Sequence, residues 1–262
     1  MSLQNHRAVI VGGTSGIGLA TAKLFLSRGA QVIVASRSQE KVDAAVKDLG
    51  SAQGYALDFQ DESQMNPFFE KIGDFDHLVV TATGGGSVNG PFGSLGIDVA
   101  RAEFDGKFWG QYTTVKAALP YIKESGSITL TSGVLAARPT RGASTLVALN
   151  SAIEGFARVL AMDLAPIRVN VVSPGMVDTP VYSGMGMDTE SLALMFQTVA
   201  QSLLIQHVAN PKRSLRLTCT WRQTHTRPGL CFKSKVVQYW LVSKQLRVIP
   251  QQHLCLGAAA DR

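Results

Sequence analysis

The chain has 262 residues, and its content of 45% hydrophobic and 17% charged residues is typical of one sizeable α/β domain and argues against two domains. No apolar run approaches the roughly 18 residues of a membrane span, and polar residues 2–7 lead straight into a short strand, so we expect a cytoplasmic protein without a secretory signal or membrane contact. The net charge of +6 is unevenly distributed, because residues 1–211 carry 15 Lys and Arg against 18 Asp and Glu, whereas residues 212–262 carry 10 against 1. We therefore predict a domain over 1–211 and treat the basic tail over 212–262 separately.

An apolar run at 8–11 leads into three spaced glycines and then into a helical pattern. Gly12 permits a sharp turn after the strand, Gly16 lets the backbone approach a pyrophosphate, and Gly18 lets the next helix pack closely on the sheet. A helix over 16–28 and a strand over 31–35 complete a βαβ unit of the expected length. The pattern predicts a nucleotide-binding loop made of Gly12, Thr14, Ser15, Gly16, Ile17 and Gly18. A glycine-rich turn in an ordinary α/β domain is the alternative interpretation.

Apolar and amphipathic segments then alternate along the chain. The pattern predicts helices over 39–49 and 61–72, strands over 53–57 and 77–81, a long helix around 100–122, a strand over 127–131, a helix around 145–164 and a strand over 168–172. This alternation is typical of a doubly wound parallel sheet with helices on both faces, a Rossmann-like α/β fold. A ligand in such a fold binds at the carboxyl ends of the strands, which fall here at Gly12, Ala35, Asp58, Thr81, Ser132 and Pro174.

Several blocks of residues 6–211 resemble the short-chain dehydrogenase/reductase family. They are VGGTSGIG at 11–18, LDF at 57–59, HLVVTATGG at 77–85, AALP at 117–120, GSITLTSG at 126–133 and a long block at 150–180 that contains the SPG motif. The resemblance implies hydride transfer between NAD(H) or NADP(H) and a small carbonyl or alcohol, and assembly as homodimers or homotetramers through long helices. It also implies cofactor contacts from Asp58, Thr81, Pro174, Gly175 and Thr179.

The end of the second expected strand bears on the form of the cofactor. An acidic residue there accepts hydrogen bonds from the ribose 2′-hydroxyl, whereas an adjacent Arg favours a 2′-phosphate. The sequence reads Val34-Ala35-Ser36-Arg37, which predicts NADP(H) bound by Ser36 and Arg37. The alternatives are that Arg37 is a solvated surface residue and that Asp58 caps a helix.

The positions that carry the chemistry of the family differ in this chain. The family transfers a hydride while a Tyr moves the proton, a Lys four residues later lowers the pKa of that Tyr, a Ser orients the substrate oxygen and an Asn completes a proton path. By their flanking motifs these positions correspond, in the same order, to Leu146, Asn150, Gly133 and Lys107. We hypothesise that Lys107 acts electrostatically or as the proton donor, together with Ser132 or the Thr131 hydroxyl. A solvated or salt-bridged Lys107 is the alternative.

The segment after the SPG motif resembles the substrate lid of the family. Tyr182 and the apolar residues of 181–202 either line the substrate pocket or pack a helix onto the core. His6, His77 and His207 show no metal-binding spacing, and residues 1–211 contain no Cys. We therefore predict no metal site.

The last fifth of the chain, residues 212–262, lacks the pattern of the family and contains all three Cys residues. Reading the codons of residues 226–237 one nucleotide earlier permits a Thr-Thr-Gly turn and a strand ending in Glu-Gly-Gly, as the family is expected to have at this point. We therefore hypothesise a one-nucleotide frameshift near codons 211–213. The alternative is a basic tail that binds nucleic acid by phosphate contacts and base stacking, or a membrane surface, although its charges form no helical face.

The sequence thus favours an NADP(H)-dependent oxidoreductase with an atypical active site, acting on a small molecule and not on nucleic acid or a membrane. Two alternatives stay open. One is a non-catalytic NADP(H)-binding sensor or partner subunit, and the other is a nucleic-acid binder that uses the basic tail.

Overall fold

Within the described part of the chain, six parallel strands form one sheet in the order β3-β2-β1-β4-β5-β6. They are β1 (Arg7–Val11), β2 (Gln31–Ser36), β3 (Gln53–Ala56), β4 (Phe75–Val80), β5 (Ile122–Thr131) and β6 (Arg168–Val172). The computed structural model describes residues 2–84, 89–182, 188–202 and 206–211, so the basic tail and residues 183–187 of the expected lid lie outside the described residues. The strand order reverses between β1 and β4, and at such a point a doubly wound sheet opens a crevice for a ligand.

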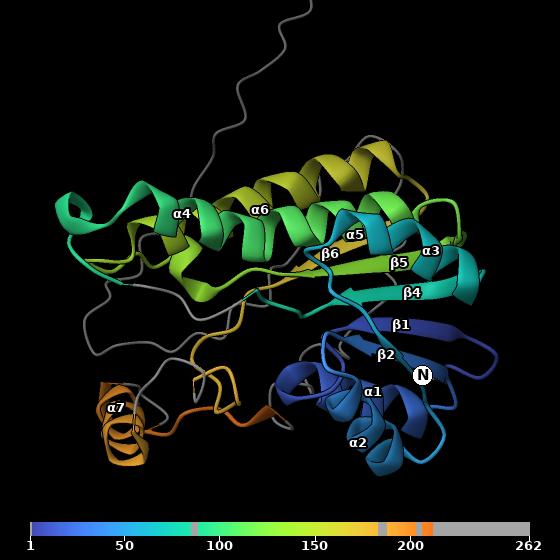
Figure 1. Cartoon of the computed structure of the whole chain (residues 1–262), viewed down its shortest axis with the longest axis horizontal. Coiled ribbons are helices and arrows are strands. Elements are labelled where there is room, and N and C mark those ends of the chain that lie inside the picture. The colour runs from blue at the N-terminus through green and yellow to red at the C-terminus, as the bar shows by residue number, and fades with distance from the viewer. Residues whose placement is uncertain (1, 85–88, 183–187, 203–205, 212–262) are drawn as a thin grey trace, which may run out of the picture.

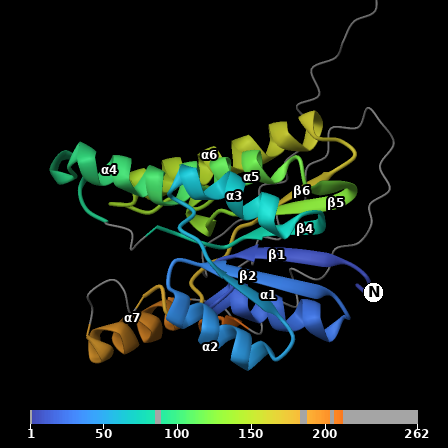
Figure 2. The ribbon, with the colours of Figure 1, turned by 45° about the vertical axis from the view of Figure 1, so that its right-hand side comes forward.

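Helices cover both faces of the sheet (Figure 1). On one face lie α1 (Gly16–Ser27) and α2 (Gln39–Leu49), and on the other lie α3 (Glu62–Ile72), α4 (Ile97–Phe104), α5 (Gly110–Ala118) and α6 (Ser144–Asp163). Helix α7 (Thr189–Ser202) stands on the α1 side, at the end of the molecule where the strands end. Figure 2 shows the same layers from a second direction. The predicted doubly wound α/β fold is therefore confirmed.

The pleat of the central strands divides the core into two clusters. Val9 and Val11 face one way and join the side chains of α3, α5 and α6, including the fully buried Phe69. Ile10 and Val34 face the other way and pack with α1 and α2. Burial of each large apolar side chain contributes about 1.5–3 kcal/mol, so both helical layers are held to the sheet by hydrophobic packing.

The predicted long helix around 100–122 is present as one helical stretch over 97–118, but it is not one regular helix and it ends four residues early. The helical stretch consists of α4, a π-helical turn at Asp105–Trp109 and α5, and it ends at Ala118 because Pro120 cannot continue a helix. Strand β5 already begins at Ile122, opposite Phe75, and the register shifts before Ser127 pairs with His77. The predicted strand over 127–131 therefore starts five residues too late, and the remaining predicted helices and strands agree with the structure to within two residues at each end.

Helix α6 is long and apolar enough to cross a membrane by length and composition alone, which the sequence analysis did not anticipate. It packs against β5 and β6, and its residues Leu149, Ile153 and Ala157 are buried in the core. The core helix of a soluble protein can meet the same criteria of length and apolar composition, so this finding is weak evidence for a membrane span.

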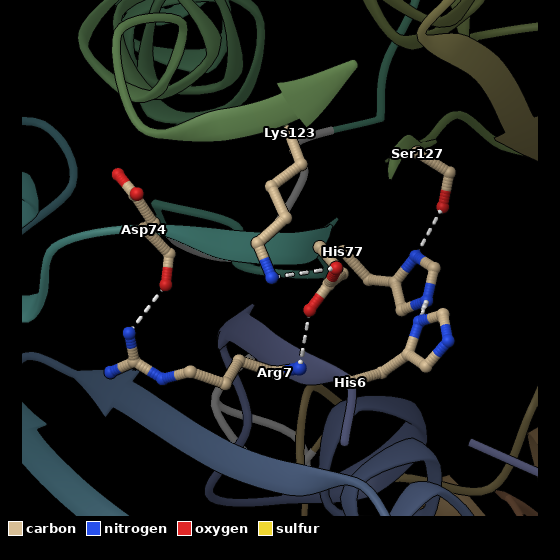
Figure 3. Close-up of polar contacts among 7 residues, drawn as sticks. His6, Arg7, Asp74, His77, Lys123 and Ser127 are labelled. Atoms are coloured by element: carbon tan, nitrogen blue, oxygen red, sulfur yellow. Dashed lines mark hydrogen bonds and ion pairs between the residues drawn. The ribbon is translucent and has the colours of Figure 1, made fainter. Parts of the chain in front are cut away.

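Two histidines that are far apart in the sequence meet at the amino-terminal ends of β1 and β4 (Figure 3). His6 Nδ1 and His77 Nε2 are 3.0 Å apart, and His77 Nδ1 lies 2.8 Å from Ser127 Oγ. Burial, followed by the positive potential of His6, lowers the pKa of His77 to about 4. The pair lies at the opposite end of the strands from the glycine loop. Within the described residues no group of three or more potential metal ligands occurs.

Candidate active site

The glycine loop joins β1 to α1, and its glycines are required by the geometry. Gly12 has φ +90° and Gly16 has φ +51°, a backbone region that favours glycine. A Cβ on Gly18 would lie 2.1 Å from the carbonyl oxygen of Gly12, so only glycine fits where α1 passes the loop. Ser15 is the N-cap of α1 and makes no side-chain capping hydrogen bond, which leaves the first amide groups of α1 for an anion. Each predicted loop residue lies between the end of β1 and the first turn of α1: Gly12, Thr14, Ser15, Gly16, Ile17 and Gly18.

Two threonines meet this loop from other parts of the chain. Thr81 follows β4, and its hydroxyl donates to the carbonyl oxygen of Gly12 at 3.1 Å. Thr179 lies over the loop, since its methyl carbon is 3.0 Å from the position that a Cβ of Gly16 would take. Pro174 and Gly175 follow β6, and the Pro174 carbonyl accepts the Val134 N–H at 2.9 Å. The segments after β1, β4 and β6 therefore gather at one edge of the sheet.

The residues expected near the adenosine half lie at the ends of β2 and β3. Ser36 is the last residue of β2, and the next residue, Arg37, is exposed. Asp58 follows β3, and its carboxylate accepts the Gln60 N–H at 3.1 Å. Helix α3 is capped by Asp61, so Asp58 is not the N-cap of this helix.

Lys107 lies in the π-helical turn, an irregularity that is frequent at functional sites. Its Nζ donates to Asn150 Oδ1 at 2.8 Å and to the Ser132 carbonyl oxygen at 3.0 Å. The residue is partly exposed, whereas its ammonium lies deep enough that burial lowers the pKa to about 8 against the opposing effect of the Glu103 carboxylate. These contacts argue against a freely solvated Lys107, and the alternative of a salt-bridged Lys107 is not tested by them. These two acceptors take two of the three N–H groups of the ammonium.

The sequence predicts that Lys107 and Asn150 have exchanged positions relative to the family pattern, and the structure brings their side chains into contact. The exchange places the ammonium on the stretch between α4 and α5 and the amide on α6. Gly133 makes room for this amide, because a Cβ there would lie 2.9 Å from Asn150 Nδ2. Leu146 is partly buried and packs against the core, so its side chain adds no polar group to the site.

The Ser132 hydroxyl is engaged inside the protein. Ser132 is 2% exposed, and its Oγ lies 3.1 Å from both the Asn150 carbonyl oxygen and Glu154 Oε1. The same carboxylate oxygen accepts a hydrogen bond from Ser173 Oγ at 2.9 Å. Glu154 therefore ties α6 to the ends of β5 and β6, while Ser132 meets Lys107 through its backbone carbonyl.

Sequence reasoning missed two polar residues beside the site, Glu154 and Gln111. Gln111 is 1% exposed and hydrogen-bonds the backbone of Thr131, whose hydroxyl in turn donates to the Val80 carbonyl. Gln111 lies four residues after Lys107, and Glu154 lies four residues after Asn150. Residues with this spacing share a helix face, so the spacing is the signal by which both could have been found.

The expected lid contains a helix, α7. Tyr182 packs edge-on against Phe196 of α7, with ring centroids 5.4 Å apart, and burial raises the pKa of its hydroxyl. This contact agrees with the packing alternative for Tyr182.

A doubly wound sheet with a glycine loop at its switch point defines a dinucleotide-binding class of protein. The family model for short chain dehydrogenases matches residues 6–189. The chain therefore belongs to the short-chain dehydrogenase/reductase family, a family of oxidoreductases.

Named relatives agree with this assignment. The short-chain dehydrogenase/reductase ucsE of an Acremonium species is 34% identical over 228 residues, which cover 76% of this chain and 84% of the relative. A solved small-chain dehydrogenase in complex with NADPH is 35% identical, with a TM-score of 0.72 over 84% of this chain and 93% of the other. The MalC reductase/Diels-Alderase of Malbranchea aurantiaca is 28% identical, with a TM-score of 0.73 over 82% of this chain and 88% of the other.

Proposed function

We propose that the chain uses NADP(H) to reduce a small carbonyl compound, or to oxidise the corresponding alcohol, with Lys107 as the proton-transferring group. The observation that carries the proposal is the contact of Lys107 Nζ with Asn150 and the Ser132 carbonyl, at the edge of the sheet where the glycine loop also lies. This arrangement supplies an ammonium where the family has its catalytic pair.

The chain has a cradle that fits a dinucleotide. The glycine loop and the uncapped N-terminus of α1 would hold the pyrophosphate, and Ser36 and Arg37 would hold a 2′-phosphate. Asp58 would face the adenine, while Thr81, Pro174, Gly175 and Thr179 would border the other half of the cofactor. When bound, the cofactor would supply or accept the hydride. The solved relative in complex with NADPH supports this choice.

Lys107 would serve as general acid during reduction. Its ammonium would direct the third N–H to the carbonyl oxygen and give up the proton as the alcohol forms. The neutral amine still has two N–H groups for Asn150 and the Ser132 carbonyl, so Lys107 would keep its position in both protonation states. In the oxidation direction the neutral amine would accept the proton. A pKa of about 8 suits both roles near neutral pH.

The test is NADPH oxidation by the full chain with a panel of small aldehydes and ketones. We expect Lys107→Met to lower kcat by at least about 100-fold, the lower end of the usual contribution of general acid catalysis. Lys116→Met, at an exposed position of α5, is the matched control and should retain its activity. Equal turnover of the Lys107→Met variant and the wild type would overturn the proposed role.

A non-catalytic NADP(H)-binding protein is the second candidate, and Leu146 and Asn150 at the family Tyr and Lys positions favour it. Tight NADPH binding without turnover across the whole panel would support this function.

We also propose a small-molecule substrate, a cytoplasmic location and assembly as a homodimer or homotetramer. An aromatic surface on the neighbouring helices supports the assembly. Phe108 and Tyr112 pack against Phe156 of α6, and the adjoining Trp109 is 49% exposed. Light scattering of the purified chain would give the mass. A monomer at all concentrations would contradict this assembly.

We propose that the tail over 212–262 results from a one-nucleotide frameshift. Among the described strands, β6 has a neighbour only on its β5 side, so the strand encoded in the other frame has a place to pair. The test is to resequence the gene across codons 205–245. One extra or missing nucleotide would support the frameshift, and an unchanged sequence would leave a translated basic tail whose nucleic-acid binding can then be assayed.

A further inference from the structure

Gln111 completes the hydrogen bonding of the last residue of β5. Its Nε2 donates to the Thr131 carbonyl oxygen at 3.0 Å, and its Oε1 accepts the Thr131 N–H at 2.9 Å. Strand β4 pairs with β5 only as far as Val79 opposite Thr129. A primary amide carries the same donor and acceptor as a peptide group, so the Gln111 side chain takes the place of a strand neighbour beyond that point.

The same contact fixes the peptide unit that leads into Ser132. The oxygen of this unit, the Thr131 carbonyl, is held by Gln111, and its N–H, on Ser132, donates to the Val172 carbonyl oxygen at 2.9 Å. The peptide plane is therefore held from both sides. The next carbonyl along the chain is that of Ser132, which accepts the Lys107 hydrogen bond.

We propose that Gln111 is a positioning residue, which orients the Ser132 carbonyl and through it the ammonium of Lys107. Lys107 and Gln111 lie four residues apart and therefore on one helical face. This face contacts two successive residues, the last residue of β5 and Ser132 after it. The inference deepens the proposed function and rests on it for its catalytic meaning.

A purely structural role for Gln111 would also explain its burial, and loss of either role would reduce stability. The protonation of Lys107 distinguishes the two, because an acceptor on the ammonium stabilises the charged form. Glu103 and Asn150 face the same ammonium and are unchanged by a substitution at 111.

The experiment measures the pKa of Lys107 in the full chain by the pH dependence of its acetylation, read by peptide mass spectrometry. Gln111→Met keeps the length of the side chain and removes both hydrogen bonds. We expect the pKa of Lys107 to fall by about 0.5 or more, because the enclosed ammonium loses an acceptor. A rise of that size would mean that Lys107 had moved into water through a general loosening of the site, and it would count against the positioning role. Gln39→Met is the control, because Gln39 is exposed and its amide contacts Asp43 on α2.

Gln111→Asn is the second variant, for the case that Gln111→Met does not fold. Its amide is one methylene too short to span the same gap, so the same shift is expected. A pKa of Lys107 that stays within about 0.5 of the wild-type value in the folded variants would overturn the proposal. The labelling needs neither substrate nor NADPH. Retained turnover in Lys107→Met would refute the proposed proton transfer by Lys107 and leave this result standing, whereas an unchanged pKa would refute the positioning role alone.

Discussion

Replacing Lys107 with Met should stabilise the protein while it removes the proposed proton donor. Burial lowers the pKa of Lys107 from its ordinary 10.5 to about 8, so the folded state holds the charged form at a cost. This difference in pKa corresponds to a cost of about 3 kcal/mol in the free energy of unfolding, which is an upper limit because the residue is partly exposed. Methionine has a similar length and no charge, but it leaves Asn150 Oδ1 and the Ser132 carbonyl oxygen without their donor, which offsets part of the gain. We therefore expect the free energy of unfolding at pH 7 to rise by less than about 3 kcal/mol.

The pH dependence of this effect has a definite sign. Below pH 8 Lys107 is protonated in both the folded and the unfolded state, and the full cost is present. Between about pH 8 and 10.5 the folded protein releases the proton while the unfolded chain keeps it, so the contribution of Lys107 to the free energy of unfolding rises with pH. The Lys107→Met variant lacks this contribution, and its advantage over the wild type should disappear by about pH 10.5.

Urea unfolding of both proteins, followed by circular dichroism at several pH values from neutral to alkaline, measures this difference. Lys116→Met is again the control, and because Lys116 is exposed its effect should stay within about 0.5 kcal/mol at every pH. A Lys107→Met variant that is less stable than the wild type at pH 7, with an unchanged difference at high pH, would refute the claim that this ammonium is desolvated.

Three further outcomes are expected. Arg37→Glu should weaken NADPH binding by at least about tenfold and leave NADH binding nearly unchanged, as measured by fluorescence titration; equal losses for both cofactors would exclude a 2′-phosphate contact. Gly18→Ala should abolish NADPH binding and lower the thermal midpoint, because the added Cβ would lie 2.1 Å from the Gly12 carbonyl oxygen; normal binding would contradict the close approach of α1 to the loop. For His77, with a pKa of about 4, the unfolded chain takes up a proton below pH 6.5 that the folded protein does not, so up to about 3 kcal/mol of stability should be lost between pH 7 and 4. His77→Gln should flatten this loss in urea unfolding, and an unchanged slope would assign the acid sensitivity to other groups.

The fold was predictable because its signals are local. The glycine loop and the alternation of buried strands with amphipathic helices each lie within a few tens of residues, and together they predict a doubly wound sheet. The error at 100–122 has a local cause as well. Pro120 ends the helix, but the apolar pattern on either side of it continues and hides the start of β5 at Ile122.

The contacts around the candidate site could be predicted only in part. Flanking motifs place Lys107 and Asn150 at positions of the family, but nothing in the sequence says that their side chains touch, because they lie 43 residues apart. The bonds of Gln111 to Thr131 and of Glu154 to Ser132 and Ser173 also join different elements. Such bonds depend on how helices pack on the ends of strands, and helical periodicity gives only the face on which a residue lies.

The predicted exchange of Lys107 and Asn150 would explain why burial and chemistry are linked in the proposed site. A Tyr–Lys pair divides the work, since the phenol moves the proton and the ammonium only tunes it. With Leu146 at the Tyr position, the amine itself would have to move the proton, and a lysine with an ordinary pKa of 10.5 holds its proton too tightly near neutral pH. Burial of Lys107 brings its pKa into the useful range, and the same burial destabilises the folded protein. The gain in stability expected for Lys107→Met and the loss expected in its turnover therefore follow from one physical cause. Observing one effect without the other would show that the two have different causes.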